Sequence, residues 1–246
     1  AMRTRESGMT LIEVLVAVLL LSLVSVGILY AMRGGFLTMS KTNERVNQHR
    51  RALGAARALE NLVTHLLPVP ADCHGGDPSI IKARIPFLQA EAATLRFVST
   101  HSLEESGRGA ARVIELHVIP GDRGAGVRLI ANEHLYTGPI GLGFFCLGPV
   151  ESPLGLRMGY PPVPINERSF VLADRLAAAR FLYRRPLSEP PFESWEPEWE
   201  PNVMLPYPTA IRIELVPLQP DPSKVLPLSV TVPLRIRRDF RERYAD

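Results

Sequence analysis

The chain has 246 residues, of which 46% are hydrophobic and 22% are charged, and its formal net charge at pH 7 is +3. So small a net charge does not favour nucleic-acid binding. The length accommodates a membrane anchor and one globular domain with its own hydrophobic core.

An apolar run begins close to the N-terminus. The 22 residues from Leu11 to Met32 contain a single charge, Glu13. About 20 apolar residues cross a bilayer as a helix, so this run is long enough to span a membrane. A secretory signal has a shorter apolar core with its cleavage site after it, whereas here the small residue, Gly8, comes before the run.

This arrangement resembles the type IV prepilin signal of type IV pilins and type II secretion pseudopilins. The matching features are a basic leader with Arg3 and Arg5, Gly8 at the cleavage position, Met9 as the new N-terminus, and an apolar run with Glu13 fifth in the mature chain. The resemblance implies a prepilin peptidase that cuts after Gly8 and methylates the Met9 amine. The mature chain would keep the whole apolar helix.

Glu13 lies where an acid is unfavourable. An ionised carboxylate in a bilayer costs at least about 2.5 kcal/mol, so such residues usually have a partner and a function. The resemblance implies that this acid faces the N-terminal amine of a neighbouring subunit. An ion pair between Glu13 and the Met9 amine would favour both charged forms and set the axial register of one subunit against the next. The alternative is that Glu13 lies near the membrane surface, reaches water and has no specific partner.

The basic residues at the two ends of the apolar run predict opposite orientations in the membrane. Arg3 and Arg5 favour a cytoplasmic leader by the positive-inside rule. Five basic residues beyond the other end favour the reverse: Arg33, Lys41, Arg45, Arg50 and Arg51. The processing signal requires a cytoplasmic leader. We therefore expect a single-pass protein of the bacterial inner membrane with its head in the periplasm.

The helix is expected to continue past the membrane and to end at Leu67, because apolar residues recur at helical spacing until Pro68 and Pro70 stop the pattern. Gly34 and Gly35 predict a bend. The expected divisions of the chain are a leader (1–8), a transmembrane or filament-core part of the helix (9–32), an amphipathic part (33–67) and an extracytoplasmic head (68–246).

From Ala71 onward, alternating apolar and polar residues between turn residues predict strands. The predicted strands are Thr94 to Thr100, Val113 to Ile119, Gly126 to Ala131, Ala179 to Arg184, Ala210 to Val216 and Ser229 to Ile236. The stretch GDRGAG (121–126) predicts a hairpin turn. Short strands separated by turns favour antiparallel sheets. The predicted fold class is α+β, with a pilin-like long N-terminal helix packed on a globular, β-rich head.

A second set of residues lies in the C-terminal half of the chain. It comprises Arg180, Phe181, Tyr183, Trp195, Trp199, Leu205, Pro206, Ala210, Ile211 and Ile213. Their pattern resembles the R-F-x-Y run, the tryptophan-containing loop and the L-P-x-A strand of J-type minor pseudopilins of type II secretion (the PulJ/GspJ family). Tyr207 and Pro208 are two extra residues relative to that family's tighter pattern.

The J-type resemblance implies a structural subunit rather than an enzyme. Such a subunit helps to initiate the pseudopilus and caps its tip, with the I-type and K-type minor pseudopilins and the major pseudopilin as partners. Trp195 and Trp199, four residues apart, are candidate partner-interface residues because large aromatics dominate interface energies. The alternative for both is that they cover the domain's own core. The first alternative function is a minor, PilW-like pilin of a type IV pilus or competence system. The second is a membrane-anchored enzyme or binding module whose head acts alone.

The chain has two cysteines, Cys73 and Cys146, both in the predicted head. In an oxidising compartment they are candidates for a disulfide that closes a long loop, which stabilises a fold by roughly 4 kcal/mol in the chain-entropy model. Cys146 lies in an apolar run, so a buried free thiol is the equal alternative.

Catalytic and metal-binding patterns are weak. The cluster DCHGGD (72–77) brings Asp, Cys and His together, but a zinc site needs four ligands and only His65 is near in sequence. No nucleophile elbow, zinc-protease motif, P-loop or dinucleotide fingerprint occurs. We therefore predict no enzyme activity, no metal, no cofactor and no small-molecule substrate.

Overall fold

The computed structural model describes residues 10–73, 83–105, 107–152, 155–201, 205–218 and 228–236. It has two compact units, residues 1–50 and 51–246. Helix α1, Leu11–Thr64, contributes to both units. The helix runs without a break through Gly34 and Gly35, where the sequence predicted a bend. Each glycine costs a helix about 1 kcal/mol relative to alanine, which this 54-residue helix tolerates.

Helix α1 ends at Thr64, before the predicted end at Leu67, because the chain joins the sheet there. Leu66 forms an isolated antiparallel bridge with Ser99. The amide of Leu67 donates to the carbonyl of Val98 at 2.8 Å. The last turns of α1 therefore belong to the same compact unit as the sheet, residues 51–246.

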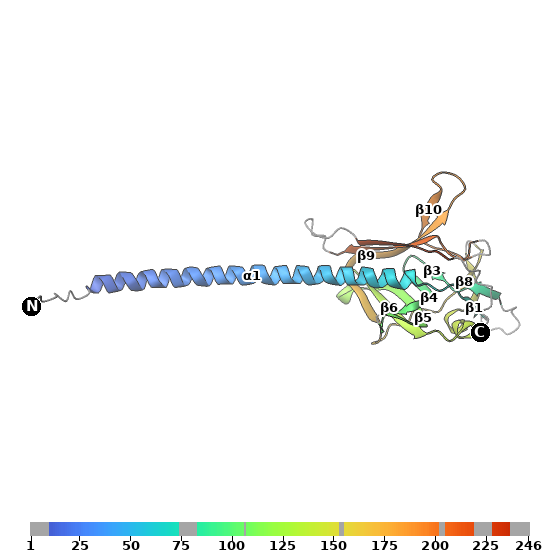
Figure 1. Cartoon of the computed structure of the whole chain (residues 1–246), viewed down its shortest axis with the longest axis horizontal. Helices are drawn as coiled ribbons and strands as arrows, with labels where there is room; N and C mark the ends of the chain where they lie inside the picture. The colour runs from blue at the N-terminus through green and yellow to red at the C-terminus, as the bar shows by residue number, and fades with distance from the viewer. Residues whose placement is uncertain are drawn as a thin grey trace, which may run out of the picture. The chain divides into compact units, whose positions relative to one another are not determined.

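An eight-stranded antiparallel sheet forms the middle of the head (Figure 1). The strand order is β12-β11-β9-β6-β5-β4-β3, and β10 pairs with β9 beside this path. Each of the strands predicted from the sequence is present. The bounds are β3 (Gln89–Ala90), β4 (Thr94–Ser102), β5 (Gly107–Pro120), β6 (Val127–Leu135), β9 (Phe170–Pro186), β10 (Glu193–Glu196), β11 (Ala210–Pro217) and β12 (Leu228–Pro233).

The turn between β5 and β6 confirms the predicted hairpin. A short 3-10 helix, η1 (Asp122–Gly124), fills it, and the amide of Gly121 donates to the carbonyl of Gly126 at 2.8 Å. Gly126 has a φ of +67°, and a Cβ there would meet the carbonyl oxygen of Leu176 at 2.2 Å. Glycine is therefore required at position 126, both for the backbone conformation and for the close approach of β9.

One face of the sheet packs on the end of α1. Leu59, Leu62 and Val63 of the helix are fully buried in this core. The sheet contributes alternate residues of neighbouring strands, which point to the same face. They include Leu95, Phe97, Ile114, Leu116, Leu129, Phe181, Tyr183, Ile211 and Ile213.

The other face of the sheet is also buried. Val98 and Val113, which alternate with the core residues of the first face, pack with Phe87 and Leu142 in a second apolar cluster. Two small sheets and two short helical turns complete this layer. Their bounds are β1 (Pro70–Cys73), β2 (Ala83–Pro86), α2 (Pro139–Leu142), η2 (Gly143–Phe145), β7 (Gly148–Ser152) and β8 (Gly155–Gly159). The structure thus confirms the α+β class with a long N-terminal helix and an antiparallel β-rich domain.

Candidate functional site

The N-terminus of α1 has the T-x-x-E pattern of a capping box, of which the bond from the Thr10 amide to the Glu13 carboxylate is present. The carboxylate of Glu13 accepts long hydrogen bonds from the Thr10 amide (3.4 Å) and the Thr10 hydroxyl (3.5 Å). The amide of Glu13 donates to the carbonyl of Thr10 at 3.0 Å. Glu13 therefore satisfies a donor that the helix leaves free, and its negative charge lies at the positive end of the helix dipole.

The apolar surface of α1 is uncovered in the single chain. Within the described residues, Leu11–Phe36 is the one helical stretch that is long and apolar enough to cross a membrane. Its large apolar side chains are exposed. Exposure of so large an apolar surface to water is unfavourable, so a membrane or neighbouring subunits are expected to cover it.

In the head, Cys73 and Cys146 form a disulfide with a Cα separation of 5.6 Å. The bond attaches the segment after η2 to the end of β1 and lies in the second apolar cluster. Cys73 is oxidised here and is not available as a thiolate ligand. The following residues of the DCHGGD cluster, 74–77, lie outside the described residues. Where the chain is described, no three His, Cys, Asp or Glu side chains come together to hold a metal ion.

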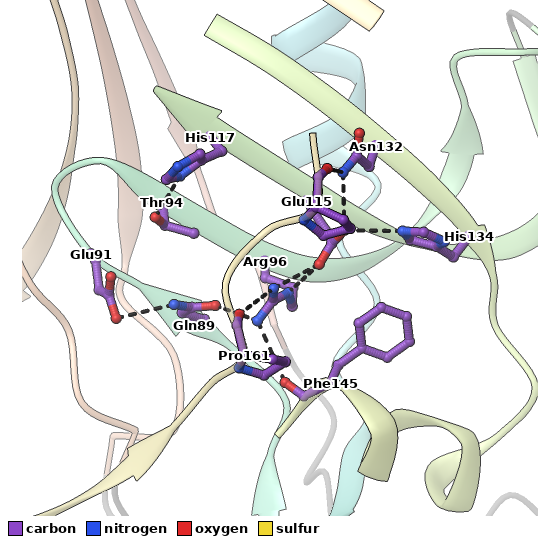
Figure 2. Close-up of polar contacts among 11 residues, drawn as sticks. Gln89, Glu91, Thr94, Arg96, Glu115, His117, Asn132, His134, Phe145 and Pro161 are labelled. Atoms are coloured by element: carbon purple, nitrogen blue, oxygen red, sulfur yellow. Dashed lines mark hydrogen bonds and ion pairs between the residues drawn. The ribbon is translucent and has the colours of Figure 1, made fainter. Parts of the chain in front are cut away.

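A buried ion pair lies at the middle of the second face of the sheet (Figure 2). Arg96 of β4 and Glu115 of β5 are direct cross-strand neighbours. The guanidinium donates to the Glu115 carboxylate at 2.7 Å, and the two side chains are 0% and 1% exposed. A second donor is His134, whose Nε2 lies 3.0 Å from the other carboxylate oxygen. Asn132 adds a longer bond of 3.3 Å.

Arg96 also holds the chain segment that covers it. Its guanidinium donates to the carbonyl oxygens of Pro161 (3.1 Å) and Phe145 (3.5 Å) and to the side chain of Gln89 (2.6 Å). Its charge lies over the rings of Phe145 and Tyr160 at 5.9 and 5.7 Å. One buried arginine therefore ties Phe145 and Pro161 to the sheet through their main-chain carbonyls.

The pKa of Glu115 reflects this arrangement. Burial favours the neutral acid and raises the pKa, but the hydrogen bond from His134 and the charge of Arg96 more than offset it, so the pKa lies below its ordinary value. Glu115 is therefore ionised at neutral pH. Its charge balances that of Arg96.

The two tryptophans of the predicted interface have different environments. Trp199 is 3% exposed and belongs to the main core, and its amide donates to the carbonyl of Ala90 at 2.9 Å. Trp195 lies on β10, is partly exposed, and has the guanidinium of Arg212 3.8 Å from its ring centroid. The structure thus gives Trp199 the core position that was the alternative for it, and leaves Trp195 as the accessible member of the pair.

The residues of the C-terminal resemblance come together in β9 and β11. Phe181 is the cross-strand neighbour of Ile213, and Tyr183 that of Ile211. All four are buried in the core. Of the two extra residues, Tyr207 is buried, and its hydroxyl donates to the carbonyl of Val69 at 3.4 Å. The β9 and β11 members of the shared pattern that pair with each other thus lie in the core of the head.

Residues 3–29 match the family described as the prokaryotic N-terminal methylation motif. This match supports a pilin-type or pseudopilin-type protein. A search of curated proteins finds no match to the chain. The matched stretch contains the predicted cleavage position Gly8, the expected new N-terminus Met9 and the acid Glu13. Gly8 and Met9 lie outside the described residues, and Glu13 is the third residue of α1.

Sequence reasoning missed two polar features. The first is the capping box of Thr10 and Glu13, although T-x-x-E before an apolar run is its sequence signature. The second is the Arg96–Glu115 pair. Its signal was one charged residue inside each of the strands TLRFVST and VIELHVI. Only the register shows that the two charges are opposite each other.

Proposed function

We propose that the chain is a J-type minor pseudopilin of the type II protein secretion system, a structural subunit of the pseudopilus. The match of residues 3–29 to the methylation motif supports the prepilin-type part of this proposal, and the J-type part rests on the C-terminal resemblance. A prepilin peptidase cuts after Gly8 and methylates the amine of Met9. Helix α1 holds the chain in the bacterial inner membrane, with the head in the periplasm, until it joins the pseudopilus.

Glu13 has two successive partners in this account. In the single subunit its carboxylate caps the first turn of α1 through Thr10, over bonds of 3.4 and 3.5 Å. Bonds this long are weak, so the carboxylate can exchange them for the charged Met9 amine of a neighbouring subunit. The exchange fixes the axial register between subunits, and the exposed apolar surface of α1 packs beside its neighbours.

The disulfide supports the periplasmic location of the head. Disulfides persist in oxidising compartments such as the bacterial periplasm and are rare in the cytosol. Cys73 and Cys146 are bonded and lie in the unit that follows residue 50. This location agrees with the orientation that the processing signal requires, and not with the orientation that the basic residues beyond the apolar run favour.

The minor, tip-forming role follows from the head and from the C-terminal pattern. A subunit with a large head can end a helical assembly that smaller major subunits extend. The paired core residues of β9 and β11 are those that resemble J-type subunits. The partners are the I-type and K-type minor pseudopilins and the major pseudopilin. On the head, we assign the partly exposed Trp195 to partner contact.

The proposal is tested with the full-length chain co-produced with other prepilins and recovered from membranes. Glu13→Gln is the decisive variant, because glutamine also completes a capping box but carries no charge. We expect Glu13→Gln to insert into the membrane and to lose co-purification with the I-type and K-type prepilins. The control is Glu44→Gln, on the same helix beyond the apolar span. Co-purification with type IV pilus prepilins instead would identify a PilW-like minor pilin, and unchanged association of Glu13→Gln would contradict both.

A further inference from the structure

A proline-rich segment lies against the buried ion pair on the second face of the sheet. We call it the strap, residues 160–164 (YPPVP), and three of its five residues are prolines, which have no N–H. Its main chain attaches to the sheet by accepting hydrogen bonds from side chains. The Pro161 carbonyl accepts from Arg96 at 3.1 Å (Figure 2). The Pro164 carbonyl accepts from the side chain of Asn132 at 2.7 Å.

The strap begins next to the disulfide. The amide of Leu147 donates to the carbonyl of Gly159 at 2.8 Å, and Gly148 and Gly159 are cross-strand neighbours in the β7–β8 pair. Gly159 directly precedes the strap, and Leu147 directly follows Cys146. A path with one main-chain hydrogen bond thus connects the strap to the disulfide and, through Cys73, to the end of β1.

Phe145, which directly precedes Cys146, contacts the same arginine as the strap. Its carbonyl accepts from Arg96 at 3.5 Å, and its ring centroid lies 6.4 Å from that of Phe87 and 5.3 Å from that of His134. Its side chain is nevertheless only partly buried. We call residues 145–147 together with residues 159–164 the cover. The hydrogen bonds from Arg96 to the cover end on carbonyl oxygens, which water can also hydrate.

Closing of the cover has opposing energetic consequences. It buries apolar groups, among them Val163, and it lets the hydroxyl of Tyr160 donate to the carbonyl of Leu88 at 3.0 Å. It also removes the charges of Arg96 and Glu115 from water, which is unfavourable unless every hydrogen bond to them is made. Because these terms oppose each other, we expect an untethered cover to open locally while the rest of the head stays folded.

The disulfide tethers the cover. A covalent link keeps an opened cover close to its closed position, so the entropic cost of closing it is smaller. Both cysteines are buried in the second apolar cluster, and their Cα atoms are 5.6 Å apart when the cover is closed. Closure thus brings the two sulfur atoms together, and the bond in turn favours closure, because coupling between two equilibria is reciprocal.

We propose that the disulfide is a redox-controlled clasp, so that the cover closes over the Arg96–Glu115 pair only once Cys73 and Cys146 are oxidised. The inference rests on the proposed function for one point, which is that the head reaches an oxidising compartment. The head is then completed only after it has crossed the membrane.

The oxidation is a thiol–disulfide exchange with a disulfide-containing oxidant. The thiolate of one cysteine attacks the oxidant's disulfide and forms a mixed disulfide. The thiolate of the other cysteine then displaces the oxidant's sulfur. Cys73 and Cys146 lose two electrons and two protons in total, and the oxidant leaves as a dithiol that carries both.

Carboxyl labelling of Glu115 measures closure directly, because this side chain is 1% exposed when the cover is closed. The full-length chain in detergent micelles is labelled with a carbodiimide and glycine ethyl ester. One sample is oxidised, and the other is reduced with dithiothreitol and freed of the reductant without air. Mass spectrometry compares Glu115 with the exposed Glu198, which is the internal reference. We expect reduction to raise labelling of Glu115 by about tenfold or more and to leave Glu198 unchanged.

A second measurement and two variants separate opening of the cover from unfolding of the head. In amide hydrogen exchange, the amides that pair β9 with β11 should stay protected after reduction. Cys73→Ala/Cys146→Ala should be labelled at Glu115 like the reduced chain, with or without reductant. The control is Tyr160→Phe, which removes the hydroxyl bond of the strap and keeps the disulfide. Glu115 of the oxidised Tyr160→Phe chain should remain unlabelled.

Three results would overturn this inference. Glu115 that stays unlabelled in the reduced chain would show that the noncovalent contacts close the cover by themselves. Labelling of Glu115 with loss of β9–β11 protection would show that the disulfide holds the whole head rather than the cover. Free Cys73 and Cys146 in the chain recovered from bacterial membranes would show that the clasp does not form. Processing at Gly8 and the association tested by Glu13→Gln are measured independently, so failure of the clasp is distinguishable from failure of the proposed function.

Discussion

The guanidinium of Arg96 and the carboxylate of Glu115 meet at 2.7 Å with both side chains almost fully removed from water. The remaining N–H groups of Arg96 donate to the main-chain carbonyls of Phe145 and Pro161, among other acceptors. Removing two charges from water is expensive, so this pair contributes to stability only while both members and their hydrogen bonds remain.

Arg96→Met should therefore destabilise the head by about 3 to 5 kcal/mol, because it leaves the Glu115 charge buried without its main partner. The measurement is the free energy of unfolding from urea denaturation. The control is Arg180→Met, which removes the exposed Arg180–Glu214 pair and should cost less than about 1 kcal/mol. The double variant Arg96→Met/Glu115→Leu should recover part of the loss. Equal effects of Arg96→Met and Arg180→Met would show that burial of the pair has no energetic consequence.

The disulfide should stabilise the head mainly by restricting the unfolded chain. Cys73 and Cys146 are separated by 73 residues, for which the chain-entropy model gives about 4 kcal/mol. Cys73→Ser/Cys146→Ser should lower the free energy of unfolding by about this amount under oxidising conditions. Under reducing conditions the double variant and the unmodified chain should have similar stability. A difference that persists after reduction would assign the effect to packing of the two side chains instead.

Stability should fall as the pH is lowered through the range in which histidine titrates. Burial and the nearby charge of His65 lower the pKa of His101, and burial lowers that of His117 despite its hydrogen bond with Ala93. A lowered pKa means that the unfolded chain binds more protons than the folded chain below about pH 6.5. The free energy of unfolding is therefore highest above that pH and decreases below it. Denaturation at pH 7.5 and at pH 5.5 measures the slope.

The double variant His101→Gln/His117→Gln tests the origin of that pH dependence. Neither glutamine takes up a proton, so the part of the slope that these two histidines cause should disappear. A slope that is the same in the double variant and the unmodified chain would contradict the assignment to His101 and His117.

The two tryptophans should separate core packing from partner contact. Trp199→Ala should destabilise the head by about 3 to 5 kcal/mol, because it removes a large buried side chain. Trp195→Ala should cost no more than about 1 kcal/mol, chiefly its interaction with Arg212. We expect Trp195→Ala to reduce recovery of partner prepilins while the thermal midpoint changes little. Normal recovery with Trp195→Ala would remove this residue from the interface.

Strong local patterns predicted much of the fold. The strands that include Phe97, Ile114 and Ile213 were predicted because alternation of apolar and polar residues is a local property. The hairpin turn near Gly126 was predicted because positive-φ positions favour glycine. Strand order and register were not predictable, because they depend on which segments meet at long range. The Arg96–Glu115 pair exists only in that register and so was not predicted.

The candidate site was predictable to different degrees along the chain. The N-terminal signal is contiguous, so the methylation motif and the membrane-length helix could both be predicted from the sequence. Burial of Trp199 depends on its bridge to Ala90, far away in sequence, and nothing local distinguishes Trp199 from Trp195. The proximity of Cys73 and Cys146 likewise follows from the tertiary fold.

The most direct test of the central claim is the mass and fragmentation of the N-terminal peptide of the full-length chain recovered from bacterial membranes. We predict a peptide that begins at Met9 and carries one methyl group on its amine, and an uncleaved leader when the prepilin peptidase is absent. A mature N-terminus elsewhere, or a leader that persists in the presence of an active peptidase, would contradict the assignment of this chain to prepilin-type assembly subunits.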